Sequence, residues 1–196
     1  DKGYDVTVFE KNSSFGGRAR KFEANGFTFD MGPSWYWMPD VFEKYFNDFN
    51  KKVSDYYNIK KLDPAYTVYF GSNDSIEIKG DIDSICKTFD EHEKGASKSL
   101  KKFMSQANKN YSIAMDKIVY KPGISIFELI TFKTITRIRY FLTNIKSEVA
   151  KYFKNKKLRQ ILEFPVLFLG AKPENTPAFY NIMNHADFGL GTWFPE

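Results

Sequence analysis

The feature that most constrains the fold is a strand pattern near the start of the chain that ends in a carboxylate. Residues 5–9, Asp-Val-Thr-Val-Phe, alternate polar and apolar side chains and are rich in β-branched residues, so they predict a strand ending at Glu10. Two adjacent glycines, Gly16 and Gly17, follow within one loop and precede Arg18. A second short strand is predicted at residues 27–31, and the residues directly after it are Gly32, Pro33 and Ser34.

This order of residues suits the binding of a phosphate-bearing nucleotide. In a dinucleotide-binding βαβ unit, a carboxylate about 20 residues after a glycine-rich turn takes the ribose hydroxyls. Glu10 stands where that carboxylate is expected, the paired glycines let backbone N–H groups approach an anion, and the fork of Arg18 matches phosphate oxygens. A plain turn with a solvated arginine is the simpler alternative. The glycine-rich turn itself is expected before Asp1, so we expect the chain to be an internal piece of a longer protein.

Composition argues against several classes of protein. Hydrophobic residues make up 42% of the 196 residues and charged residues 27%, which is typical of a folded protein. The single cysteine, Cys86, excludes an internal disulfide and fits a reducing compartment, which predicts a cytoplasmic location. His92 and His185 stand far apart without cysteine partners, so no metal site is expected. No signal peptide and no long uncharged apolar run typical of a transmembrane helix is visible.

Positive charge is concentrated in a block at about residues 117–165. Residues 117–159 hold eleven Lys or Arg and two Glu, while the whole chain carries only +5, which indicates an anionic surface as partner. If residues 125–154 form one helix, an apolar stripe from Phe127 to Val149 is flanked by four basic residues, Lys133, Arg137, Arg139 and Lys146. Such a helix either faces the core or lies at a membrane surface. A nucleic-acid partner is not favoured, because the basic residues do not interleave with exposed aromatic ones.

The remaining periodicities predict further elements. Pro39 opens an amphipathic helix with aromatic side chains at spacings of three and four. The other predictions are a hairpin of residues 66–70 and 76–78, helical structure over 82–115, a short helix ended by Pro165 and a helix over 177–184.

The motifs taken together resemble one family. A strand-ending acidic residue, "GGRA" and "FDMGP" are typical of flavin amine-oxidase-like proteins, and "GPSWYWMPDVF", "SDYYNIKKLDPAYTVYF" and "HADFGLGTWFP" narrow the likeness. With them the whole chain resembles the bacterial phytoene desaturases, which are FAD-dependent carotenoid desaturases. The resemblance implies an α/β protein (α+β overall). It divides into a partial Rossmann-like FAD-binding domain at residues 1–62 and a partial substrate domain at 63–196, with a small sheet and a helical, membrane-facing block.

The resemblance also implies roles for individual residues. Glu10 would hold the adenosine ribose of FAD, and Gly16, Gly17 and Arg18 would line its pyrophosphate and ribityl region. Gly32, Pro33 and Ser34 would lie near the isoalloxazine ring. The flavin would accept a hydride from a long carotenoid polyene drawn from a membrane surface, where the protein would be peripherally bound. No catalytic acid, base or nucleophile is assigned, and the oligomeric state is left open.

Three alternatives remain at this point. A desaturase of hydroxylated carotenoids and a carotene isomerase that uses flavin without net oxidation belong to the same family and share these motifs. The third is an inactive flavoprotein piece that binds only membrane or lipid, and the absence of the glycine-rich turn from the chain favours it for the isolated piece, which we expect to lack desaturase activity.

Overall fold

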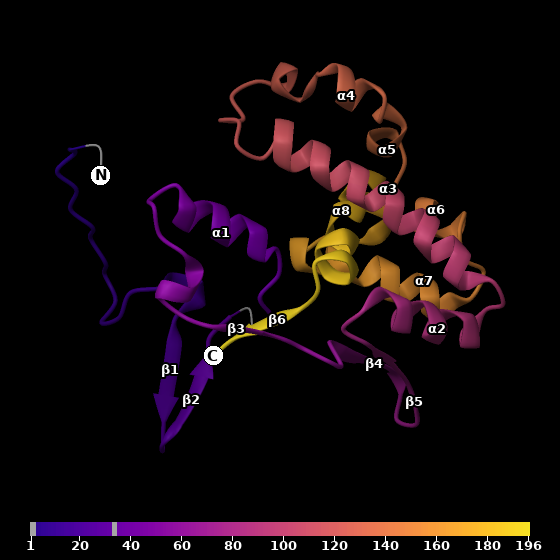
Figure 1. The fold of residues 1–196 in the computed structure, drawn as a ribbon, viewed down its shortest axis with the longest axis horizontal. Coiled ribbons are helices and arrows are strands. Elements are labelled where there is room, and N and C mark those ends of the chain that lie inside the picture. Colours follow the sequence, from indigo (N-terminus) through magenta and orange to yellow (C-terminus); the bar gives the residue numbers. More distant parts are fainter. Residues whose placement is uncertain (1–2, 33–34) are drawn as a thin grey trace. The chain divides into compact units, whose positions relative to one another are not determined.

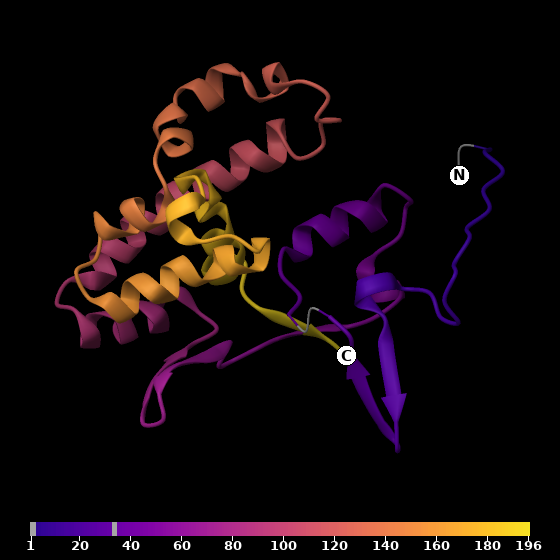
Figure 2. The same cartoon turned by 180° about the vertical axis from the view of Figure 1, so that it is seen from behind.

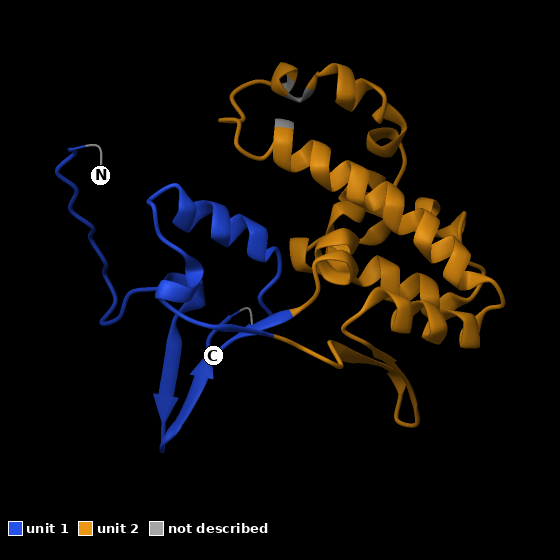
Figure 3. Cartoon of the chain, viewed as in Figure 1, with its two compact units in different colours: residues 1–60, 193–196 blue, residues 61–192 orange. Residues whose placement is uncertain are grey.

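The computed structural model describes residues 3–32 and 35–196, and the chain divides into two compact units. Unit 1 comprises residues 1–60 and 193–196, and unit 2 comprises residues 61–192 (Figure 3). Both contain short strands and helices, and each sheet is a two-stranded one. The fold is therefore a mixed one of helices and small sheets.

A hairpin forms the first part of unit 1. Strand β1 (Lys21–Ala24) pairs antiparallel with β2 (Phe27–Asp30), and Ala24 lies opposite Phe27. The two-residue turn between them is Asn25-Gly26, and both residues have positive φ, 52° and 82°, as a type I′ turn requires. The predicted strand at 27–31 is confirmed and ends at Asp30. Its partner was not predicted, although the Asn-Gly pair is the sequence signal for it.

The predicted helix from Pro39 is confirmed as α1 (Pro39–Asn47). Its apolar face gathers aromatic rings: the Phe42 ring centroid lies 4.4 Å from that of Tyr36, and the Phe46 centroid lies 4.8 Å from that of Tyr56. A 3-10 turn at Val53–Asp55 follows. Strand β3 (Ile59–Lys61) then pairs with β6 (Trp193–Pro195), which brings the end of the chain back to its first part.

The predicted strand at residues 5–9 is wrong for this structure. Residues 4–10 have no regular secondary structure, and Val8 and Phe9 are 86% and 93% exposed. The side chains of this segment alternate in polarity, but a strand also needs a neighbour for its backbone N–H and C=O groups. No strand in the described residues pairs with this segment.

Unit 2 is mainly helical. Its strands and α-helices are β4 (Tyr66–Gly71), β5 (Asp74–Ile78), α2 (Ile82–His92), α3 (Ala96–Lys117), α4 (Phe132–Ile135), α5 (Ile138–Leu142), α6 (Ile145–Ala150), α7 (Lys156–Glu163) and α8 (Ile182–Asn184) (Figure 1). Short 3-10 helices lie at Ile126–Leu129, Phe164–Leu169, Pro173–Asn175 and Ala178–Asn181, and a π-helical segment lies at His185–Gly189. The predicted hairpin is confirmed as β4 and β5, and it projects from the helices of the same unit in both views (Figure 1 and Figure 2).

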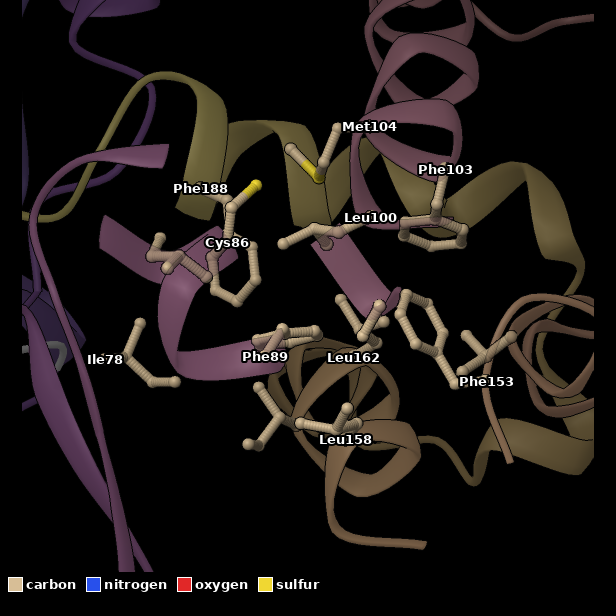
Figure 4. Packing of buried hydrophobic residues seen from close by; sticks show 14 of the residues in the cluster. Ile78, Cys86, Phe89, Leu100, Phe103, Met104, Phe153, Leu158, Leu162 and Phe188 are labelled. Atoms are coloured by element: carbon tan, nitrogen blue, oxygen red, sulfur yellow. The ribbon is translucent and has the colours of Figure 1, made fainter. Parts of the chain in front are cut away.

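The core of unit 2 lies between the hairpin and four helices, namely α2, α3, α7 and α6, the last of which contributes Ile145 and Val149. Phe89 of α2, Leu100 and Phe103 of α3, and Leu158 and Leu162 of α7 are fully buried together with Phe153 (Figure 4). Each apolar side chain of this size contributes roughly 1.5–3 kcal/mol through burial. A second cluster contains Ala114, Tyr140, Ala178 and Phe179.

The predicted helical run over 82–115 divides into α2 and α3. Gly95 interrupts it with a φ of 80°, a left-handed conformation that glycine adopts without strain. The Glu93 carboxylate accepts hydrogen bonds from the backbone N–H groups of Lys154 and Asn155 at 2.9 and 2.6 Å. Glu93, which lies at this break, therefore also caps the chain segment that leads into α7.

The single helix predicted over 125–154 is wrong. Thr131 and Asn144 interrupt it because their side chains accept hydrogen bonds from the backbone N–H groups of Thr134 and Ser147, which starts new helices. The apolar stripe is accordingly not one face: Ile145 and Val149 are fully buried, whereas Phe127 is 75% exposed. Further along the chain, Pro165 lies inside a 3-10 helix, and the helix predicted over 177–184 is mostly 3-10 with α8 at its end.

Candidate functional site

The glycine loop and the segment after β2 lie against each other in unit 1. The backbone N–H of Met31 donates to the carbonyl of Arg20 at 2.9 Å. A Cβ atom on Gly32 would collide with the carbonyl oxygen of Arg18, so this close approach requires glycine. The structure therefore brings together three of the residues predicted from separate motifs, namely Gly17, Arg18 and Gly32.

The loop itself is a tight turn that presents Arg18. Gly16 and Gly17 have φ angles of 111° and 56°, and the Gly16 carbonyl accepts a hydrogen bond from Ala19 N–H at 2.9 Å. Residues 17–19 form one 3-10 turn. Arg18 is exposed and has no hydrogen bond or ion pair to any residue of the described part of the chain. A guanidinium held on such a turn is available for an external anion.

Glu10 is exposed, and its orientation is set locally. Oε1 accepts hydrogen bonds from Asn12 backbone N–H at 2.8 Å and from Asn12 Nδ2 at 2.7 Å. These hydrogen bonds, with a smaller effect from the charge of Arg20, hold the pKa of the Glu10 carboxyl below its usual value. Oε2 takes no hydrogen bond within residues 3–32 and 35–196, so one carboxylate oxygen is open to a hydroxyl donor.

A hollow of about 200 Å³ adjoins the loop. It is lined by Ala19, Asp30, Met31, Gly32, Trp35, Tyr36 and Pro195. Trp35 stacks on Trp37 with ring centroids 5.7 Å apart, and Tyr36 Oη lies 3.0 Å from Tyr57 Oη. Burial, and then this hydrogen bond, raises the pKa of the Tyr36 phenol well above its usual value. The hollow is aromatic on one side, which suits part of a planar ligand.

The predicted site was incomplete. Trp35 and Tyr36 were missed as lining residues, although the run Trp-Tyr-Trp at residues 35–37 directly follows the glycine motif and was an available signal. Pro33 and Ser34, predicted near the flavin ring, lie outside the described residues.

A second polar group, the buried carboxyl of Asp187, was not predicted from the sequence. Asp187 in the π-helical segment is buried, and it accepts hydrogen bonds from Tyr66 Oη at 2.5 Å and Thr192 Oγ1 at 3.1 Å. Burial raises the pKa of its carboxyl to about 7, against the opposing effect of both hydrogen bonds. Residues 121 positions apart meet here, so no local pattern could have indicated the pair.

The π-helical segment also borders a wider hollow in unit 2. This hollow of about 570 Å³ is lined by His185, Phe188 and Gly189 together with residues of α3 and of the β5–α2 junction. A Cβ on Gly189 would collide with the His185 ring, which itself packs on Tyr111 at 4.9 Å between ring centroids. The floor is apolar, with Met104 and Phe188 buried.

Neither a metal site nor a membrane-spanning helix is seen among the described residues. No group of three His, Cys, Asp or Glu side chains is placed to hold a metal ion there. No helix among the same residues is long and apolar enough to cross a bilayer.

Comparison with known proteins places these residues in a family. The family model described as "Flavin containing amine oxidoreductase" matches residues 1–196. The carotenoid 3,4-desaturase of Haloarcula japonica is 42% identical over 199 residues, which cover 100% of this chain and 40% of that protein. A 4,4'-diapophytoene desaturase of Staphylococcus haemolyticus is 31% identical over 93% of this chain and 37% of its own length. The zeta-carotene-forming phytoene desaturase of Myxococcus xanthus is 27% identical over 100% of this chain and 38% of its own length.

The residues of this chain correspond to only a part of each relative. The chain spans about 40% of the length of the curated relatives that it matches. Because the family model covers every residue of it, the chain belongs to the flavin-containing amine oxidoreductase family.

Proposed function

We propose that the whole protein containing this chain is a FAD-dependent desaturase of a carotenoid polyene, an oxidoreductase that acts on CH–CH groups. The observation that carries the proposal is the glycine loop of unit 1, which holds Arg18 exposed and packs against Gly32 beside an aromatic hollow. Three relatives named as desaturases of carotenoid or phytoene substrates match along nearly the whole chain.

Each of the site residues has a role in binding FAD. Glu10 accepts a ribose hydroxyl on Oε2, because Oε1 is already engaged by Asn12. The turn at Gly16 and Gly17 and the Arg18 guanidinium hold the pyrophosphate. Gly32, with Pro33 and Ser34 beside it in sequence, lets the backbone come close to the ring end. Residues 1–62 in this proposal are part of a FAD-binding domain of α/β type, and residues 63–196 are part of the substrate domain.

The chemistry of hydride acceptance is supplied by FAD when it is bound. The chain's own residues bind the cofactor, orient the polyene and exclude water. No side chain acts as nucleophile, acid or base in this proposal. A second candidate activity is desaturation at a 3,4 bond, which is favoured by the name of the Haloarcula relative and its 42% identity.

Expression of the whole gene in cells that accumulate phytoene tests the activity. Pigment analysis should show a polyene with additional conjugated double bonds, and the purified protein should show a flavin absorption spectrum. A parallel strain that accumulates a fully conjugated acyclic carotene separates the two candidates: a new pigment only there favours 3,4 desaturation. Unchanged pigments in both strains, with a protein that binds FAD, would reject the substrate class and leave the cofactor intact.

The protein in this proposal is cytoplasmic and peripherally bound to a membrane surface. The support is a set of exposed apolar side chains in the segment 124–142, including Ile124, Phe127, Phe132 and Leu142, which are 75–86% exposed. All four basic residues predicted to meet the headgroups have internal partners. Lys133 pairs with Asp116, Arg137 donates to Gln106, Arg139 pairs with Glu148, and Lys146 lies 4.0 Å from Glu174. Apolar insertion therefore contributes more to binding than charge does.

Flotation of the whole protein with liposomes tests this part of the proposal. Phe132→Asp with Leu142→Asp should abolish binding to neutral and anionic vesicles. Tyr69→Asp is the matched control, since Tyr69 is 74% exposed on β4 and lies outside the segment. Equal flotation of all three proteins would reject segment 124–142 as the membrane contact.

A further inference from the structure

A groove between α6 and α7 gathers basic side chains from both helices. Its volume is about 430 Å³, and it is lined by Lys146, Ser147, Ala150, Lys156, Arg159, Gln160 and Glu163. The lining positions on α7 are spaced by three and four residues, so they form one face of that helix. The lining positions on α6 are the second, third and last of its helical residues, and Ala150 leaves room because its side chain is small.

The charges in this groove do not balance. Three cationic side chains face it, and Glu163 is the one carboxylate in its lining. Lys146 has a distant ion-pair partner, Glu174, at 4.0 Å, and both side chains are about half exposed, so this pair contributes little. Lys156 forms no ion pair within the described part of the chain. The cluster therefore keeps a net positive charge that an anion would neutralise.

The groove is also partly preorganised. The Nε–H of Arg159 donates to the Phe153 carbonyl at 2.6 Å, which fixes the guanidinium while its outer nitrogens are not used in that bond. Phe153 is itself buried in the core, so the anchor is rigid. Burial, with a smaller effect from the charge of Glu174, raises the pKa of the Glu163 carboxyl, and the charges of Lys146 and Arg159 oppose this, which places these two cations close to the same carboxyl.

We propose that the α6–α7 groove binds a phosphate group, which the Arg159 fork and the two lysines hold together with the Ser147 hydroxyl. Arg–phosphate contacts are bidentate and planar, and lysines add point charges, so phosphate fits better than a halide or a single carboxylate. The phosphate comes either from a lipid headgroup or from a free phosphate compound. The site is separate from the glycine loop of unit 1 and does not depend on the proposed desaturase activity.

The test measures phosphate binding directly, with the whole protein. Inorganic phosphate and pyrophosphate are titrated calorimetrically into wild type, into Lys146→Gln/Lys156→Gln and into the control Lys154→Gln/Lys172→Gln. The two double variants lose the same charge, and the control residues are exposed and lie outside the groove. Loss of two charge-assisted contacts should weaken phosphate or pyrophosphate binding by about tenfold or more in the groove variant, with at most about a twofold change in the control.

A vesicle arm separates the two sources. The same three proteins are floated with vesicles of phosphatidic acid in phosphatidylcholine and with phosphatidylcholine alone. A groove-specific loss on the phosphatidic acid vesicles assigns the site to headgroups, and a groove-specific loss in the titration without one on vesicles assigns it to a soluble phosphate compound. Arg159→Lys, which keeps the charge and loses the fork, should reproduce part of the loss. If groove and control variants behave alike in both arms, the proposal is wrong.

Discussion

The two units differ in what holds them together. Among its described residues, unit 1 buries the side chain of Val53 alone, and its hairpin, its turns and its exposed aromatic pairs carry the local structure. Unit 2 packs a continuous apolar core of helices against a hairpin. The candidate cofactor site lies in the unit without a buried core. Glycine turns and close backbone approaches shape that site, so substitutions there should change ligand binding more than stability.

The largest expected effect is on the core of unit 2. Phe153→Ala should lower the free energy of unfolding of that unit by about 3–5 kcal/mol, because Phe153 is fully buried and its ring packs edge-on against Phe89 at 5.7 Å. Phe42→Ala is the matched truncation in unit 1, where the side chain is 41% exposed, and should cost less than about 2 kcal/mol. Hydrogen exchange measured on peptides from each unit checks both values. Similar losses would remove the contrast between the units.

The second effect is a pH dependence confined to unit 2. Burial raises the pKa of Asp187 to about 7 in the folded state, so the folded protein binds a proton more tightly than the unfolded chain does. Stability from this group is fully present below pH ~4 and is lost as the pH rises to about 7, by up to roughly 4 kcal/mol. Asp187→Asn should remove that slope, because the amide is neutral at every pH and can still accept from Tyr66. Denaturant unfolding at pH 5 and pH 8 measures the difference between the two proteins. If the free energy of unfolding changes equally between pH 5 and pH 8 in wild type and in Asp187→Asn, the pKa of Asp187 is not raised by folding.

The third effect concerns the cofactor and belongs to unit 1. Arg18→Ala should weaken FAD binding by the whole protein by about 1.5–3 kcal/mol, the range for a hydrogen bond to a charged group. Lys11→Ala removes an equal charge from an exposed position near the loop and should leave affinity within about twofold. Fluorescence titration with FAD measures both variants. Equal weakening by the two would mean that Arg18 acts only through long-range charge.

Sequence patterns predicted the local elements of both units better than they predicted which elements pair or pack together. Pro39, the β4–β5 alternation and the glycine loop were identified because their signals lie within a few residues. Strand 5–9 failed because its alternation says nothing about a pairing neighbour. The long helix over 125–154 failed because Thr131 and Asn144 cap new helices, an outcome that a helical wheel does not weigh.

The candidate site shows the same limit. The Gly32 contact with Arg18 could be expected from glycines in two neighbouring motifs, but Tyr66 and Asp187 meet only through the tertiary fold. The stripe from Phe127 to Val149 predicted one amphipathic surface, whereas packing buried one end of it in the core and left the other exposed. Roles that depend on long-range packing were therefore beyond the sequence.

The smallest expected effect tests whether the hairpin of unit 1 supports the site. Gly26→Ala places a side chain at a φ of 82°, and no atom lies within 4 Å of the new Cβ, so the cost is conformational and of order 1 kcal/mol. The hairpin should fray, and protection of the Met31 N–H bonded to Arg20 should fall, because β2 leads directly to Met31. Gly71→Ala is the control: its φ is not positive, and its Cβ also meets open space. Hydrogen exchange and FAD affinity, measured on both variants, test whether the hairpin supports the cofactor site. If Gly26→Ala loosens the hairpin and FAD binds as before, the hairpin is a neighbour of the cofactor site and does not support it.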